Sequence, residues 1–190
     1  MGAEAKIYET GTGVIKERIR KNYRIEQLDE KIRRQRTRKE TDLINKARRA
    51  GVKAPLITKS DEYSITMQKI RGPSIKNHLL KTRDTAVCMR IGEAIRALHD
   101  SDIIHGDPTT SNMILSQDGV YVIDFGLGSR STRIEDKAVD IHLFKQALES
   151  KHSQISQECF KEFLKTYSKT RDYKKIMNRL EKVEARGRYK

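Results

Sequence analysis

The sequence predicts an α+β protein with two lobes: a small N-terminal β-sheet lobe carrying one long helix, and a reduced, mostly helical C-terminal lobe. Short apolar runs near the start favour strands, an unbroken charged stretch over residues 24–50 favours a long helix, and helical spacing dominates the second half. The 190 residues are enough for one substantial core or two small lobes. Because Gly72-Pro73 breaks the chain, we expect a single domain over 1–190, with an N-lobe over 1–70, a C-lobe over 71–185 and a basic tail over 186–190.

The elements of the N-terminal lobe follow from its apolar residues and its helix-ending residues. Residues 1–16 are typical of short strands, with apolar members at Ala5, Ile7, Val14 and Ile15. The long helix ends at Gly51, and Pro55 follows shortly after it. Two further runs are expected to pair as a hairpin across Ser60-Asp61-Glu62, namely residues 55–59 and 63–70.

The C-terminal lobe is predicted to be mostly helical. Ile91, Ile95 and Leu98 recur at helical spacing, so they should face the core. Helices are expected over residues 74–81, 85–100, 135–150, 156–168 and 172–185.

The cysteine usage and the absence of long apolar runs favour an intracellular protein. Cys88 and Cys159 have neither metal-binding nor redox spacing, so we expect ordinary reduced side chains. No apolar run approaches the length of a membrane span, and no signal-peptide pattern opens the chain. We therefore expect a cytoplasmic protein without membrane contact, also nuclear if its source is eukaryotic.

Three polar side chains in the second half have the spacing that phosphoryl transfer uses. Asp107 follows His105-Gly106, and Asn112 lies five residues later, which is the Asp-to-Asn step of a kinase catalytic loop. Asp124 opens an Asp-Phe-Gly. Asn and Asp oxygens suit Mg²⁺, and Asp107 would orient or deprotonate the attacking hydroxyl or water. The set predicts a kinase-like site for ATP and Mg²⁺, with Asn112 and Asp124 as metal ligands.

A predicted β-hairpin brings the two metal ligands together. The apolar runs 113–115 and 120–123 flank Asp118-Gly119, a turn signal. Asn112 then lies directly before one strand, and Asp124 directly after the other.

A phosphate site also needs a lysine held by a glutamate. Val14-Ile15-Lys16 resembles the strand that carries this lysine in kinases. Glu40 shares a helical stripe with the apolar residues three, four and seven positions later, so it should face the core. A carboxylate there needs a cation, because burying it unpaired is costly. We expect Glu40 to pair with Lys16.

The segments that would cover the phosphates and read the adenine are placed by their order along the chain. Residues 11–13 stand too close to Lys16 for a phosphate loop and are better explained as a hairpin turn. The expected phosphate loop is Gly2-Ala3-Glu4-Ala5. The adenine is expected at the segment that links the lobes, which comprises Met67, Gln68, Lys69 and Ile70.

Features of regulated protein kinases are missing. Gly106 stands where such kinases often carry an arginine that pairs with a phosphate on the activation loop. No Ala-Pro-Glu follows Gly126, and no room exists for a long activation segment, so we expect no platform for a peptide substrate.

The chain is strongly basic, with 40 Lys and Arg against 26 Asp and Glu, a net charge of +14. Such a field favours a polyanionic partner, and nucleic acid is the first candidate. Basic residues crowd the long helix and are interpreted either as a solvated face or as a surface for tRNA or an acidic partner: Lys31, Arg33, Arg34, Arg36, Arg38 and Lys39.

These motifs resemble one family over nearly the whole chain. The resemblance rests on the segments 2–5, 14–16, 23–24, 28–29, 36–40, 50–52, 124–128 and 135–140, on the Arg-Gly-Arg of the tail, and above all on His-Gly-Asp-Pro-Thr-Thr-Ser-Asn over 105–112. The chain is similar to the small atypical kinase/ATPase subunits of KEOPS (EKC) complexes, the PRPK family, which are relatives of the RIO kinases. It departs from the family at Gln68, where members tend to have Glu.

The resemblance implies a function in tRNA modification. The family's complex makes threonylcarbamoyladenosine at position 37 of tRNA. Its kinase-like subunit binds the threonylcarbamoyl-transferase subunit, acts chiefly as an ATPase and can phosphorylate Ser or Thr. Carried over, Lys16 grips the phosphates, Glu40 holds Lys16, Asp107 accepts the proton, and Asn112 and Asp124 hold Mg²⁺.

Three other functions remain open. A stand-alone serine/threonine protein kinase acting in trans would share every catalytic residue. A small-molecule kinase is disfavoured because the chain has no room for a large C-terminal substrate-binding insertion. A non-catalytic adaptor is disfavoured because the catalytic set is complete.

Overall fold

The computed structural model describes residues 5–11 and 13–187. Its N-terminal part contains a sheet whose strands all pair antiparallel. The strand order is β1-β2-β4-β3. Its strands are β1 (Ala5–Glu9), β2 (Gly13–Arg18), β3 (Ile57–Ser60) and β4 (Ser64–Gln68). The hairpin expected across Ser60-Asp61-Glu62 is present, with Ser60 as the last residue of β3, and β1 and β2 pair on either side of the turn expected at residues 11–13.

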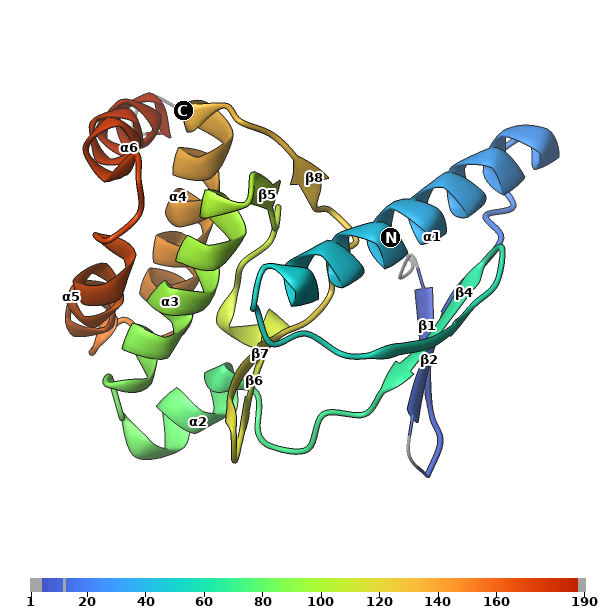
Figure 1. The fold of residues 1–190 in the computed structure, drawn as a ribbon, viewed down its shortest axis with the longest axis horizontal. Helices are drawn as coiled ribbons and strands as arrows, with labels where there is room; N and C mark the ends of the chain where they lie inside the picture. The colour runs from blue at the N-terminus through green and yellow to red at the C-terminus, as the bar shows by residue number, and fades with distance from the viewer. Residues whose placement is uncertain (1–4, 12, 188–190) are drawn as a thin grey trace.

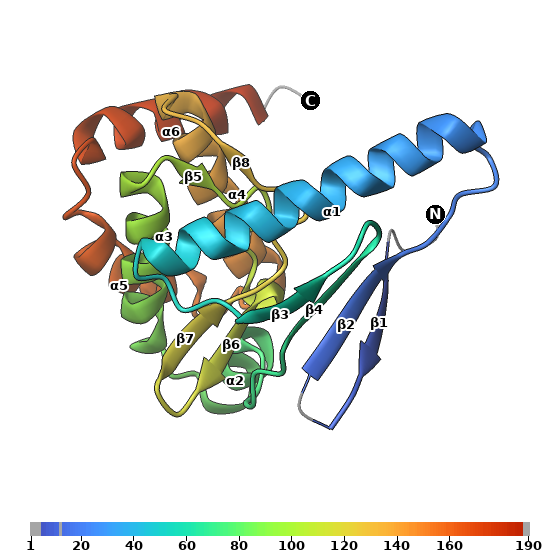
Figure 2. The ribbon, with the colours of Figure 1, turned by 45° about the vertical axis from the view of Figure 1, so that its right-hand side comes forward.

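The long helix α1 (Glu26–Arg49) confirms the helix expected over residues 24–50. It lies along the sheet, and its C-terminal end reaches the helical part of the molecule (Figures 1 and 2). The predicted stripe is buried: Glu40, Leu43 and Ile44 are 1–2% exposed. Gly51 follows in a left-handed conformation with φ +82°, which ends the helix.

The second half is mostly helical and contains one β-hairpin, as expected, together with one further pair of short strands. Its helices are α2 (Ile75–Thr82), α3 (Val87–Asp100), α4 (Ile134–Lys151), α5 (Ser156–Tyr167) and α6 (Tyr173–Gly187). The protein therefore has the predicted class, a β-sheet N-terminal part and a helical C-terminal part (Figure 1). α6 runs through the first two residues of the predicted tail, because Arg186 forms an ion pair with Glu135 of α4.

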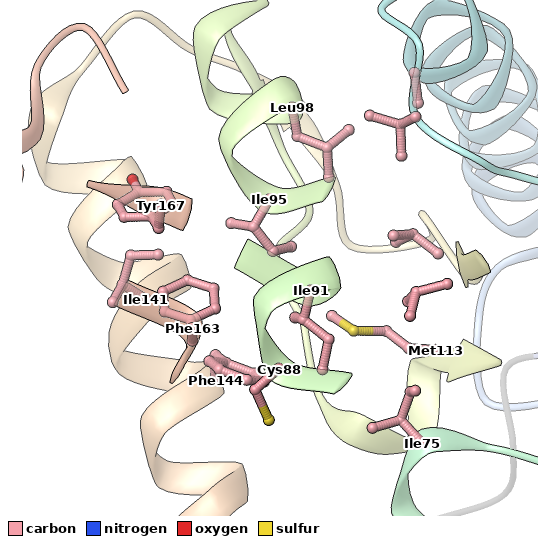
Figure 3. Close-up of a cluster of buried hydrophobic side chains, with 14 of the residues drawn as sticks. Ile75, Cys88, Ile91, Ile95, Leu98, Met113, Ile141, Phe144, Phe163 and Tyr167 are labelled. Carbon is pink, nitrogen blue, oxygen red and sulfur yellow. The ribbon is translucent and has the colours of Figure 1, made fainter. Parts of the chain in front are cut away.

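The apolar core lies around α3, which packs against α5 on one side and the β6–β7 hairpin on the other (Figure 3). Ile91, Ile95 and Leu98 are fully buried, as their spacing predicted. Phe163 of α5 packs on Phe144 of α4, with ring centroids 4.7 Å apart. Cys88 and Cys159 are buried free thiols within this core.

One hairpin and one pair of strands that are distant in the sequence position the site. β6 (Met113–Ser116) pairs with β7 (Gly119–Val122), and β5 (Ile103–Ile104) pairs with β8 (Ser129–Arg130). The turn of the β6–β7 hairpin lies at residues 117–118, one residue earlier than the predicted Asp118-Gly119, because Gly119 already pairs with Ser116. Among the helices of the described residues, none combines the length and apolar character needed to cross a membrane.

Candidate active site

Lys16 lies between two carboxylates at the centre of the site. Its Nζ is 2.7 Å from Glu40 Oε1 and 2.7 Å from Asp124 Oδ1. Lys16 is 9% exposed and Glu40 1%. The pairing expected between Lys16 and Glu40 is present, and Asp124 joins it from a distant part of the chain.

Arg18 is a second cation on Glu40, and sequence reasoning missed it. Arg18 Nη2 lies 2.6 Å from Glu40 Oε2, and the side chain is 5% exposed. Lys16 and Arg18 are two residues apart on β2, so they share the inner face of the strand while Glu17 is exposed. This two-residue period was the available signal: an arginine two positions beyond a buried strand lysine faces the same way.

Asp124 sits in a tight turn against Lys16. Its φ is +61°, a left-handed conformation that Asp adopts more readily than most residues. The Gly126 N–H donates to Asp124 Oδ1 at 3.2 Å, and a Cβ at Gly126 would lie 3.0 Å from that oxygen. Burial works to raise the pKa of Asp124, but the charge and hydrogen bond of Lys16 outweigh burial and hold the pKa below its usual range. Asp124 is therefore ionised at neutral pH.

Asp107 and Asn112 are joined directly. Asn112 Nδ2 donates to the Asp107 carbonyl at 3.0 Å and to Asp107 Oδ2 at 2.8 Å. Both of these oxygens accept, so the amide nitrogen must face Asp107, and Asn112 Oδ1 is left for another partner. Asn112 ends the short helix η1 (Thr110–Asn112) directly before β6, as the predicted hairpin requires.

His105 links the Asp107 loop to the strand end before Asp124. Its Nδ1 accepts from the Asp107 N–H at 3.2 Å, and its Nε2 lies 3.1 Å from the Ile123 carbonyl. Burial lowers the pKa of His105, so the ring is neutral and its single proton sits on Nε2, which donates to Ile123. The Ile123 N–H in turn donates to the Asn112 carbonyl at 3.0 Å. These bonds place the two predicted metal ligands side by side.

Asp140 of α4 anchors the backbone of the loop from inside the core. Its Oδ2 accepts from the His105 N–H at 2.7 Å, and its Oδ1 accepts from the Gly106 N–H at 2.8 Å. Asp140 is fully buried. Sequence reasoning gave it no individual role, because nothing local marks a residue whose partners lie more than thirty positions earlier.

A chain of hydrogen bonds extends this anchor to α5. His99 Nε2 is 3.3 Å from Asp140 Oδ2, and His99 Nδ1 is 2.7 Å from the Tyr167 hydroxyl. Burial, together with the charge of Asp140, raises the pKa of Tyr167, so the hydroxyl keeps its proton and donates it to Nδ1. Nε2 of His99 then carries the ring proton toward the carboxylate. The Asp107 loop is thus held from three helices of the core.

The structure explains why glycine stands at position 106. Its φ is +82°, and a Cβ there would lie 2.5 Å from the Leu127 carbonyl oxygen. An arginine, the residue of phosphorylation-regulated kinases, does not fit this backbone. The expected loss of that switch has a steric cause.

The residues of the site fit Mg²⁺ bound together with a nucleotide. Asn112 Oδ1 and the half-exposed carboxylate of Asp124 are hard oxygen ligands. Within residues 5–11 and 13–187, no group of three or more His, Cys, Asp or Glu side chains is placed to hold a metal alone. Mg²⁺ is commonly bound by one or two protein carboxylates plus substrate phosphates, and the single carboxylate of Asp124 beside Asn112 fits that pattern.

The predicted phosphate loop is only partly described. Gly2, Ala3 and Glu4 lie outside the described residues, and Ala5 begins β1, paired with Arg18.

Met67 and Gln68 close β4, where the Gln68 N–H donates to the Leu56 carbonyl at 2.8 Å. Lys69 forms an ion pair with Glu9. A hollow of about 610 Å³ adjoins this linking segment and is lined by residues 68–73, 115–118 and Tyr121.

The segment after Gly126 is short and is paired at its centre. Only residues 127–133 separate Gly126 from α4. Ile103 pairs with Arg130 and Ile104 with Ser129, and the Ser131 N–H donates to the Asp102 carbonyl at 3.0 Å. The expected lack of room for an activation segment is therefore visible in the fold.

The basic face of α1 is divided between the two interpretations. Arg33 Nε lies 2.6 Å from Asp29 Oδ2, and its guanidinium stacks 4.0 Å from the Tyr63 ring centroid. Arg34 pairs with Glu62. Of the other basic residues of this face, Lys31, Arg38 and Lys39 are exposed, and Arg36 is half-buried.

The RIO domain family matches residues 3–128, about two thirds of the chain. The chain is 39% identical over 207 aligned residues to the KEOPS complex subunit Bud32 of Pyrococcus abyssi, covering all of this chain and 94% of that protein. It is 39% identical to the EKC/KEOPS complex subunit BUD32 of Enterocytozoon bieneusi, covering 80% of this chain and 82% of that protein.

Longer relatives also match. The chain is 44% identical to the "probable bifunctional tRNA threonylcarbamoyladenosine biosynthesis protein" of Methanothermobacter thermautotrophicus, over 99% of this chain but only 36% of that protein. The chain thus spans about a third of these bifunctional relatives. A solved structure of WaaP in complex with acyl carrier protein shares the fold alone, with a TM-score of 0.64 at 13% identity over 95% of this chain and 88% of that one. The chain belongs to the RIO domain family and, within it, to the family of the Bud32 subunits.

Proposed function

We propose that this Bud32-family protein binds ATP with Mg²⁺ and hydrolyses it as a subunit of a KEOPS-type complex that makes threonylcarbamoyladenosine in tRNA. The observation that carries the proposal is the pairing of Lys16 with Asp124 and of Asn112 with Asp107 beside a short segment over residues 127–133. Within that segment, Ser129 and Arg130 pair with β5. Water is then the acceptor that the geometry leaves.

Each side chain has a role that its contacts support. Asp107, held by Asn112, orients the attacking water and accepts its proton. Lys16, held by Glu40, neutralises charge on the nucleotide phosphates. Asn112 Oδ1 and Asp124 would hold Mg²⁺, which would help to neutralise the charge of the phosphates. Gly106 and His105 keep Asp107 in register through Asp140.

The partners of the protein form part of the same proposal. The names of its relatives place them in KEOPS complexes or in tRNA threonylcarbamoyladenosine biosynthesis. We assign to this chain a threonylcarbamoyl-transferase partner, other KEOPS subunits and tRNA. The net charge of +14 and the exposed Lys31, Arg38 and Lys39 of α1 support a polyanion nearby. The buried free thiols of Cys88 and Cys159 support the cytoplasm as the location.

Hydrolysis measured with and without partners tests the proposal. ATP turnover is followed for the chain alone, with the transferase subunit, and with transferase and tRNA together. Turnover should be slow alone, rise with both partners and vanish in Asp107→Ala. Turnover that neither partner nor tRNA changes would contradict the complex-bound function.

A serine/threonine protein kinase is the second candidate, because Asp107 is equally placed to accept a proton from a hydroxyl. It requires stoichiometric transfer of phosphate to a defined protein, lost in Asp107→Ala. The short segment over 127–133 favours hydrolysis over this reaction.

A further inference from the structure

Glu40 is shared between two cations, one on each oxygen. Lys16 Nζ lies 2.7 Å from Oε1, and Arg18 Nη2 lies 2.6 Å from Oε2. Lys16 is 9% exposed, Arg18 5% and Glu40 1%. Hydrogen bonds between ions at such distances are strong ones, and both are removed from bulk water.

Lys16 has a second carboxylate partner, which makes its position a compromise. Asp124 Oδ1 is also 2.7 Å from Lys16 Nζ. When phosphates enter the site, the ammonium group of Lys16 must interact with them as well, and its interaction with Glu40 becomes weaker. A buried carboxylate that loses its only cation is strongly destabilised, because neither water nor another charge compensates it.

Arg18 removes this penalty. Its guanidinium stays on Glu40 Oε2 when Lys16 shifts, so the buried carboxylate keeps a charge-assisted hydrogen bond. A Cβ built on Gly126 would lie 3.7 Å from Arg18 Nη2 and 3.5 Å from Lys16 Nζ, so both cations stand beside the same turn. With Lys16, Arg18, Glu40 and Asp124 charged, the cluster is neutral; without Arg18 it carries one negative charge that repels phosphate.

We propose that Arg18 is a positioning residue for nucleotide phosphates, acting as the reserve counter-ion of Glu40 that frees Lys16 to bind them. This inference rests on the proposed function, since it concerns the same site. Arg18 acts through its contact with Glu40. It sets how much of the Lys16 charge is available to phosphates while Glu40 still holds Lys16, so its effect falls on phosphate affinity and hardly on the chemical step.

The test compares Arg18→Met and Arg18→Lys with the wild-type chain. Affinity is measured by calorimetry for a non-hydrolysable ATP analogue with Mg²⁺ and for adenosine, and KM and kcat are measured for ATP hydrolysis. Arg18→Met should weaken analogue binding and raise KM about tenfold, the effect of losing one charge-assisted hydrogen bond. Adenosine affinity should stay within about twofold, because adenosine carries no phosphate, and kcat should stay within about threefold, because Arg18 acts on affinity. Both changes are smaller than the tenfold effect that corresponds to about 1.4 kcal/mol. Arg18→Lys, which keeps the charge without the guanidinium fork, should restore part of the loss.

Arg33→Met is the matched control. It removes an equally short arginine–carboxylate contact on α1, the helix that carries Glu40. Arg33 Nε lies 2.6 Å from Asp29 Oδ2, and Asp29, like Glu40, is 1% exposed. Arg33→Met should leave the ratio of analogue to adenosine affinity unchanged. Should Arg18→Met fail to fold, Arg18→Lys carries the test by its own rise in KM.

The outcomes separate this inference from the proposed function. A wild-type chain that binds the analogue no better than adenosine, and does not hydrolyse ATP, contradicts the proposed function itself. A wild-type chain that binds and hydrolyses normally, while the Arg18 variants keep wild-type analogue affinity and KM, overturns the role of Arg18 alone. An equal loss of analogue and adenosine affinity also overturns it, because that pattern marks a purely structural residue.

Discussion

The two halves of the site are held in place by different forces. On the side of the sheet, Lys16, Arg18 and Glu40 hold one another by charge. On the side of the helices, backbone N–H groups of the Asp107 loop donate hydrogen bonds to Asp140, which is fully buried. Ion pairs re-form when a new charge arrives, whereas a fully paired buried network resists change. From this contrast we expect nucleotide phosphates to rearrange the first half and to leave the second half unchanged.

The largest effect on ATP turnover should come from replacing Asp107, the reactive group on the side of the helices. Asp107→Asn keeps the size of the side chain and removes its basicity, so ATP turnover should fall about a thousandfold, in the range of general base catalysis. Nucleotide affinity should stay near wild type, because Lys16 and Asp124 are untouched. Steady-state hydrolysis and calorimetry measure the two effects. A parallel loss of affinity and turnover would mean that the two halves are not independent.

Removing the anchor should cost stability as well as activity. Asp140→Asn replaces one accepting oxygen by an NH₂ group, so the N–H of His105 or Gly106 loses its acceptor in the core. We expect the free energy of unfolding to fall by about 3 kcal/mol, and turnover to fall with it. Denaturant titration gives the first value.

Asp172→Asn is the control for that measurement. Asp172 pairs with the exposed Lys175, and the midpoint of unfolding should hardly move. Equal midpoints for Asp140→Asn and Asp172→Asn would show that Asp140 anchors nothing.

Two glycines test whether the loop is under steric constraint. Gly106 and Gly51 share φ +82°, but a Cβ at Gly106 would lie 2.5 Å from the Leu127 carbonyl oxygen, whereas a Cβ at Gly51 meets nothing within 4 Å. Gly51→Ala should cost about 1 kcal/mol for the left-handed backbone alone. Gly106→Ala should cost about 2 kcal/mol or more, because the clash adds to that strain. Equal costs, measured by thermal or denaturant unfolding, would contradict the close approach of Leu127.

The smallest effect concerns pH. Burial lowers the pKa of His105 in the fold, while the unfolded chain keeps a value near about 6.5. As pH falls below that value, the unfolded state binds a proton that the folded state does not, so stability decreases toward acid pH. Unfolding measured between neutral and mildly acidic pH should show this slope in the wild type and a shallower one in His105→Asn. An unchanged slope would mean that His105 does not control it.

How far the site was predictable depended on how local each signal was. Asp107, Asn112 and Asp124 stand at characteristic spacings around a hairpin, and the hairpin is present. Glu40 was found because four residues of one helix share a stripe. Asp140 was not assigned a role, because its partners are backbone N–H groups that carry no residue type.

Arg18 shows a different limit. Its side of the strand followed from a period of two, but its partner Glu40 was already assigned to Lys16. Sequence patterns suggest pairs more readily than shared partners, and a carboxylate with two buried cations appears only when the distances are known.

The measurement that tests the account most directly is the fate of the γ-phosphate. ATP labelled at that position is given to the complex of this chain with its transferase partner and tRNA, and free and protein-bound label are counted within one turnover. The account predicts that the label appears as inorganic phosphate, and that Asp107→Asn stops its release. Label transferred stoichiometrically to a protein of the complex, with little free phosphate, would contradict hydrolysis and make the chain a protein kinase.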